Sequence, residues 1–115
     1  MTLEIWHNPR CTKSRETLAL LRQKGVEPHV REYLEDVPSV DELKAVLKKL
    51  GFASARDWMR TGEADYKALG LKHVTDETKL LEAMAAHPKL IERPVVIHGE
   101  RAALGRPPEK VLEIL

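Results

Sequence analysis

The sequence holds one cysteine in 115 residues, and aromatic residues make up only 4% of it. One thiol forms no internal disulfide, and it cannot complete a structural zinc site, whose ligands are mostly several Cys and His side chains. The histidines after residue 28 show no metal-ligand spacing among themselves. We therefore expect no bound metal, and a reducing compartment such as the cytoplasm.

Long apolar runs and a strong charge bias are also missing. No apolar run approaches the length of a membrane span, and the N-terminus lacks the basic and apolar regions of a signal peptide. The formal net charge is +1, which argues against nucleic acid as a direct partner. These absences predict a soluble cytoplasmic protein with no membrane partner. We also expect a monomer, although the absences do not bear on the oligomeric state.

Several catalytic motifs are absent as well. There is no phosphate-binding P-loop and no dinucleotide fingerprint. The cysteine stands in Cys11-Thr12-Lys13-Ser14, which lacks the second thiol of a dithiol site, and Thr17 occupies the place of a phosphatase-type arginine. A lone thiol that reduces a substrate passes its oxidised state to an outside thiol, for which glutathione or a glutaredoxin is the natural donor.

What is present is a polar segment, His7–Arg15, that follows a predicted strand at Leu3–Trp6 and opens a helix ending at Gly25. Thr12 or Ser14 is the expected helix cap. Cys11 therefore lies at a helix N-terminus, where free N–H groups and the helix dipole favour negative charge. The neighbouring cations Arg10, Lys13 and Arg15 favour it further. An inert buried cysteine would have aliphatic neighbours, so we interpret Cys11 as a nucleophile.

The remaining chain predicts an α/β fold. A second strand at 26–33 follows the first helix, and a helical block at about 39–88 precedes two further strands at 93–97 and 102–104. Within that block, Ser39 and Thr75 are the expected caps of two helices. The order β-α-β, helical insertion, β-β-α predicts a thioredoxin-like four-stranded mixed sheet in a single domain, residues 1–115. A type II′ turn is expected at Gly99-Glu100, and a last helix should turn Val111, Leu112 and Leu115 towards the sheet.

Three arginines stand where predicted elements meet: Arg60, Arg93 and Arg106. Arginine suits the bidentate recognition of an oxyanion. Arg93 and Arg106 each precede a proline, whereas Arg60 has the weakest case from its own surroundings. Pro94 opens the third predicted strand, and a cis bond after Arg93 is expected there.

The other polar residues near Cys11 have two interpretations each. His7 either tunes the thiolate or holds the loop through a structural hydrogen bond. Ser14 bonds the thiolate or caps the helix, two roles that are compatible with each other. Asn8 is expected to brace the loop through its side chain.

Four separated motifs together resemble the ArsC family of glutaredoxin-coupled arsenate reductases: His7–Arg15, Arg60–Glu63, Glu92–Val96 and Leu104–Pro107. The resemblance implies that Cys11 attacks arsenate and that Arg60, Arg93 and Arg106 bind the oxyanion. It also implies that His7 and Ser14 favour the thiolate, that glutathione is the co-substrate and glutaredoxin the partner, and that no cofactor is bound.

Two alternatives remain open. A monothiol, glutaredoxin-like oxidoreductase acting on protein thiols fits the C-x-x-S motif but leaves the three arginines unexplained. A regulator resembling the Spx proteins shares the fold, but that class favours a second cysteine where this chain has Ser14.

Overall fold

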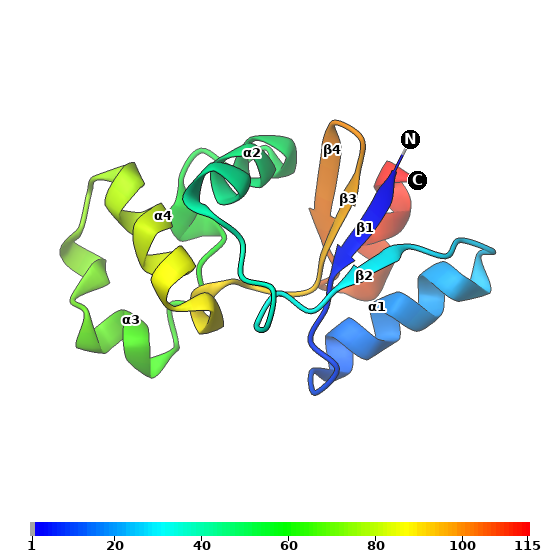
Figure 1. Ribbon diagram of the computed structural model, residues 1–115, viewed down its shortest axis with the longest axis horizontal. Coiled ribbons are helices and arrows are strands. Elements are labelled where there is room, and N and C mark those ends of the chain that lie inside the picture. The colour runs from blue at the N-terminus through cyan, green and yellow to red at the C-terminus, as the bar shows by residue number, and fades with distance from the viewer. Residues whose placement is uncertain (1) are drawn as a thin grey trace. The chain divides into compact units, whose positions relative to one another are not determined.

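The computed structural model of the protein describes residues 2–115, which form two compact units (Figure 1). One unit combines residues 2–36 with Arg93–Leu115 and contains the sheet. The other, Val37–Glu92, is built from helices. No helix of the described chain is long and apolar enough to cross a membrane.

The sheet contains the strands β1 (Leu3–Trp6), β2 (His29–Arg31), β3 (Val95–His98) and β4 (Arg101–Leu104). Their order across the sheet is β2-β1-β3-β4. β1 pairs in parallel with β2 and antiparallel with β3, which pairs antiparallel with β4. This is the predicted thioredoxin-like mixed sheet. The second strand begins later than predicted, because Pro28 directly before it has no N–H to extend the ladder, and it ends at Arg31 instead of residue 33.

One face of this sheet carries the core of the unit. Ile5 on β1 lies between Val30 on β2 and Val96 on β3, so the three side chains share a face. Helix α1 (Thr12–Gln23) packs there and ends as predicted, with Gly25 in the left-handed region at φ 79°. The buried cluster comprises Ile5, Leu18, Leu21, Val96, Val111 and Ile114. Each of these side chains contributes about 1.5–3 kcal/mol when fully buried.

The last helix differs from the prediction. It is a 3₁₀ helix, η4 (Pro108–Ile114), with three residues per turn. This period buries Pro108, Val111 and Ile114 on one face, whereas Leu115 is 43% exposed. The expectation that Leu115 faces the sheet is therefore wrong, because it assumed an α-helical period. The β3–β4 turn has φ 62° at Gly99 and no positive φ at Glu100, as a type II′ turn requires.

The helical unit contains three α-helices joined by 3₁₀ turns. Its elements are α2 (Val40–Leu50), η1 (Ala55–Asp57), α3 (Ala64–Ala68), η2 (Leu71–His73), α4 (Glu77–Ala86) and η3 (Pro88–Leu90). The predicted Ser39 cap is confirmed, and the Glu42 side chain completes a capping box by accepting the Ser39 N–H. The predicted Thr75 cap is wrong. Asp76 caps α4 by accepting from two backbone N–H groups, and its carboxylate also suits the positive end of the helix.

Candidate active site

The loop between β1 and α1 is fixed by its own hydrogen bonds. The His7 N–H donates to the Arg31 carbonyl across 2.8 Å, which ties the loop to β2. Asn8 accepts twice: its carbonyl takes the Cys11 N–H and its Oδ1 takes the Arg10 N–H, both at 3.0 Å. The amide of Asn8 thus braces a tight turn. The turn sets Cys11 as the N-cap of α1, with φ −95° and ψ 123°.

Ser14 is buried beneath this loop. Its Oγ accepts the Asn8 N–H at 3.0 Å and shares a 2.6 Å hydrogen bond with Nδ1 of His7. The expectation that Thr12 or Ser14 caps α1 is wrong. Ser14 lies inside the helix, and its hydroxyl bonds the preceding loop.

His7 is also buried, and burial is the main cause that lowers its pKa below the usual 6.5. The positive charges of Arg22 and Arg15 lower it further, while Glu32 acts in the opposite direction. The imidazole is therefore neutral at neutral pH and serves as a fixed hydrogen-bonding partner of Ser14.

Cys11 is 8% exposed, and its sulfur faces a cation. Nη2 of Arg106 donates to Sγ across 3.7 Å. The first N–H groups of α1 lie beside the same residue and have no carbonyl partners within the helix. A guanidinium and a helix N-terminus both attract an anion that is bound next to the sulfur.

Arg106 is oriented by the backbone of Arg93, the arginine that precedes the cis proline. Its Nε donates to the Arg93 carbonyl across 2.8 Å. The Arg93–Pro94 bond is cis, as expected. The Arg106–Pro107 bond is also cis, which was not predicted. Nε of Arg93 is buried and has no hydrogen-bond partner within residues 2–115.

Gly105 makes this arrangement possible. Its N–H donates to the Pro94 carbonyl at 3.0 Å. A Cβ on Gly105 would lie 2.3 Å from Oγ1 of Thr17 and 2.7 Å from Cγ of Pro94. Only glycine fits this contact, which joins the end of β4 to α1 and to the cis proline.

Arg15 lies on the outer side of the loop. Its guanidinium donates to the Pro9 carbonyl at 2.9 Å and to Oγ1 of Thr12 at 3.2 Å. The side chain is exposed, so its visible contribution is to hold the loop and add positive charge.

Comparison with known proteins agrees with these motifs. The model of the ArsC family matches residues 6–114. The chain belongs to the ArsC family. It is 50% identical to an arsenate reductase of Haemophilus influenzae, with all of both chains covered. A solved arsenate reductase from Vibrio cholerae is 52% identical and has a TM-score of 0.97, covering 100% of this chain and 98% of its own. A putative arsenate reductase from Yersinia pestis is 57% identical with a TM-score of 0.93, covering 97% and 99%.

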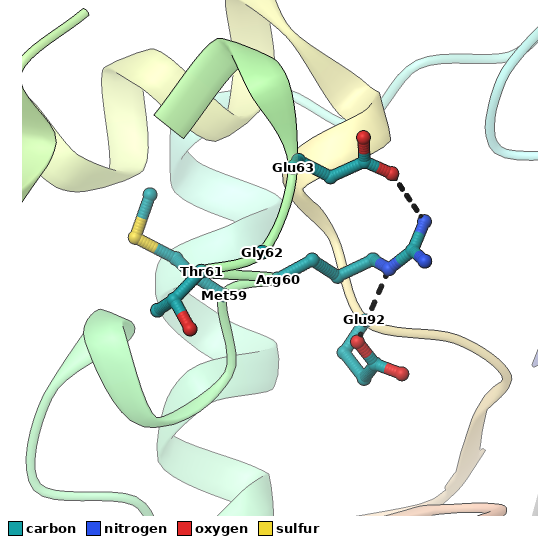
Figure 2. Close-up of a pocket in the computed structure, with 6 residues that line it drawn as sticks. All are labelled: Met59, Arg60, Thr61, Gly62, Glu63 and Glu92. Carbon is teal, nitrogen blue, oxygen red and sulfur yellow. Dashed lines mark hydrogen bonds and ion pairs between the residues drawn. The ribbon is translucent and has the colours of Figure 1, made fainter. Parts of the chain in front are cut away.

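The third arginine of this ArsC chain, Arg60, lies in the helical unit. Its backbone N–H donates to the Leu90 carbonyl at 2.8 Å, next to a bridge that pairs Met59 with Ile91. Its side chain lines a pocket with Met59, Thr61, Gly62, Glu63 and Glu92 (Figure 2).

Two carboxylates hold the Arg60 guanidinium. Nη1 lies 2.6 Å from Oε1 of Glu63, and Nε lies 3.3 Å from Oε2 of Glu92 (Figure 2). Neither carboxylate was predicted as a site residue. Glu63 stands three positions after Arg60, a spacing that could have signalled the pair. Glu92 comes from a distant segment and gave no local signal.

No three His, Cys, Asp or Glu side chains within residues 2–115 gather closely enough to hold a metal ion.

Proposed function

We propose that the protein reduces arsenate to arsenite, with Cys11 as the nucleophile. The observation that carries the proposal is the contact between Cys11 Sγ and Arg106 Nη2 at the start of α1. Relatives of about half-identical sequence that bear the name arsenate reductase support the choice of substrate.

In the first step the Cys11 thiolate attacks arsenic(V), and a sulfur–arsenic bond forms. One arsenate oxygen takes up protons from solution and leaves as water, so arsenic stays pentavalent. The first N–H groups of α1 and the guanidinium of Arg106 offset the negative charge beside the sulfur. Arg93 and Arg60 supply the remaining oxyanion contacts, as the family resemblance implies.

The second step consumes an external thiol. Glutathione replaces a further arsenic-bound oxygen, which leaves as water. A glutaredoxin thiolate then attacks the glutathione sulfur, the bond between that sulfur and arsenic breaks, and its electron pair passes to arsenic. Arsenic becomes trivalent, glutaredoxin and glutathione leave as a mixed disulfide, and water releases arsenite and the Cys11 thiol.

The loop residues keep Cys11 ready for this reaction. The hydrogen bond between His7 and Ser14, the turn at Asn8 and the contacts of Arg15 fix the backbone of the N-cap. A fixed N-cap keeps the sulfur beside the helix N–H groups, in the position from which it attacks the oxyanion. We place the protein in the cytoplasm, where glutathione keeps thiols reduced.

The test is arsenate-dependent NADPH oxidation with purified glutathione, glutaredoxin and glutathione reductase. The native protein should show saturable turnover, and Cys11→Ser should show none while keeping its circular dichroism spectrum. Turnover that survives in Cys11→Ser would remove Cys11 as the nucleophile. No turnover by a folded native protein with a reactive thiol would overturn arsenate as the substrate.

A further inference from the structure

The pocket around Arg60 has a volume of about 490 Å³, and its charges are unusual for the binding of an anion. It presents one guanidinium, from Arg60, and two carboxylates, from Glu63 and Glu92. A pocket with more negative than positive charge repels a fully ionised oxyanion.

The ion pairs of Arg60 leave one nitrogen of its guanidinium and one oxygen of Glu63 able to hydrogen-bond a ligand. Nη1 and Nε of Arg60 are engaged by the two carboxylates, whereas Nη2 has no hydrogen bond or ion pair to any part of the described chain. In Figure 2 the guanidinium lies between Glu63 and Glu92, with the remaining nitrogen directed away from both dashed contacts. Oε2 of Glu63 likewise accepts no hydrogen bond within residues 2–115. The pocket thus offers a donor next to an acceptor.

A donor next to an acceptor distinguishes two kinds of oxyanion. Arsenate and phosphate keep at least one hydroxyl proton at neutral pH, so they can accept from Nη2 and donate to a carboxylate. Sulfate has only acceptor oxygens under the same conditions and would meet the carboxylate lone pairs.

We propose that Glu63 and Glu92 are specificity residues that make the Arg60 pocket select oxyanions carrying a hydroxyl proton and reject fully ionised ones such as sulfate. This inference rests on the proposed function, because it takes Arg60 as an oxyanion ligand. It adds the reason why a cation that must bind an anion is flanked by two negative charges.

A purely structural role for the carboxylates predicts something else. If they only hold Arg60 in place, glutamine can replace them, because its amide oxygen still accepts from the guanidinium. Glutamine removes the negative charge and keeps the size. The variants Glu63→Gln and Glu92→Gln therefore separate selectivity from positioning.

The experiment measures arsenate and sulfate binding by calorimetry in a Cys11→Ser background, where no reaction follows binding. That background should bind arsenate and largely exclude sulfate. Adding Glu63→Gln or Glu92→Gln should improve sulfate affinity relative to arsenate by roughly tenfold or more. The matched control is Glu82→Gln, since Glu82 is an exposed glutamate on α4. It should leave the ratio unchanged.

Either of two results overturns the inference: a sulfate-to-arsenate affinity ratio that neither substitution changes, or a background protein that already binds both ions equally. Thermal unfolding checks that each variant is folded, and the two variants test the idea separately. In the turnover assay, sulfate should become a stronger competitor of arsenate when Glu63→Gln or Glu92→Gln is introduced into the protein with Cys11 intact.

Failure of the proposed function looks different. The background protein can discriminate between arsenate and sulfate and lose this discrimination in the glutamine variants, while the native protein shows no arsenate turnover. That result supports the selectivity and overturns the proposed reaction. A protein with Cys11-dependent turnover and no discrimination keeps the reaction and loses the selectivity.

Discussion

The guanidinium of Arg106 lies 3.7 Å from the sulfur of Cys11 through Nη2, while its Nε is held by the Arg93 carbonyl at 2.8 Å. A positive charge fixed at this place should favour the thiolate, which is the reactive form. Arg106→Ala should therefore slow the alkylation of Cys11 by iodoacetamide at neutral pH by roughly tenfold, the order expected for one charge-assisted hydrogen bond. The measurement is the rate of mass increase under excess reagent.

Arg101→Ala is the matched control for this prediction. Arg101 is an exposed arginine on β4 whose Nη2 donates to the Glu113 carbonyl at 2.7 Å. Its loss should leave the alkylation rate unchanged. Equal rates in Arg106→Ala and the native protein would show that the guanidinium does not activate the thiol.

Gly105 should tolerate no side chain. In Gly105→Ala the new Cβ meets Oγ1 of Thr17 and Cγ of Pro94 at distances that require movement of α1 or of the cis proline. We expect a loss of about 1–3 kcal/mol in the free energy of unfolding, measured in urea. Gly62→Ala is the control, because Gly62 has no atom within 4 Å of an added Cβ and should change little. A Gly105→Ala variant as stable as the control would contradict the close packing.

Local signals explain most of what the sequence predicts correctly. A capping box such as Ser39 with Glu42, or a glycine stop such as Gly25, involves neighbours in the chain. The strand at Leu3–Trp6 was correct at both ends. The order of these elements then restricts the sheet to few topologies, which is why the mixed sheet followed.

Contacts between one element and another, or between an element and a loop, explain what could not be predicted from the sequence. Serine is a residue type that often caps helices, but the hydroxyl of Ser14 is hydrogen-bonded to the buried His7 and to the Asn8 N–H instead. The fit of Gly105 against Thr17 depends on how β4 approaches α1, which no local pattern encodes. The last helix keeps a 3₁₀ period that buries Ile114 and exposes Leu115, although their apolar side chains suggest either choice.

Ser14→Ala should destabilise the protein, although it removes only one oxygen atom. The Asn8 N–H would lose its acceptor and His7 its partner, both at a buried place. An unsatisfied polar group of this kind costs about 1–3 kcal/mol. Urea unfolding should show that loss for Ser14→Ala and almost none for Thr12→Ala, whose hydroxyl is exposed and bonds only the exposed Arg15. Similar losses in the two variants would contradict the buried network.

The buried His7 should make stability depend on pH. Burial holds its folded-state pKa below the usual 6.5, so the unfolded chain binds a proton at a pH where the native protein does not. The stabilising contribution is complete above about pH 6.5 and is lost as the pH falls through that value towards the lower folded-state pKa.

Urea unfolding of the native protein and of His7→Gln between about pH 7.5 and pH 5 isolates the effect of His7, because the two proteins share all other titratable groups. The free energy of the native protein should fall more steeply than that of His7→Gln, whereas His29→Gln, at an exposed histidine, should follow the native curve. Parallel curves for the native protein and His7→Gln would show that His7 is protonated equally in both states, and that the loop beneath Cys11 does not hold a neutral imidazole.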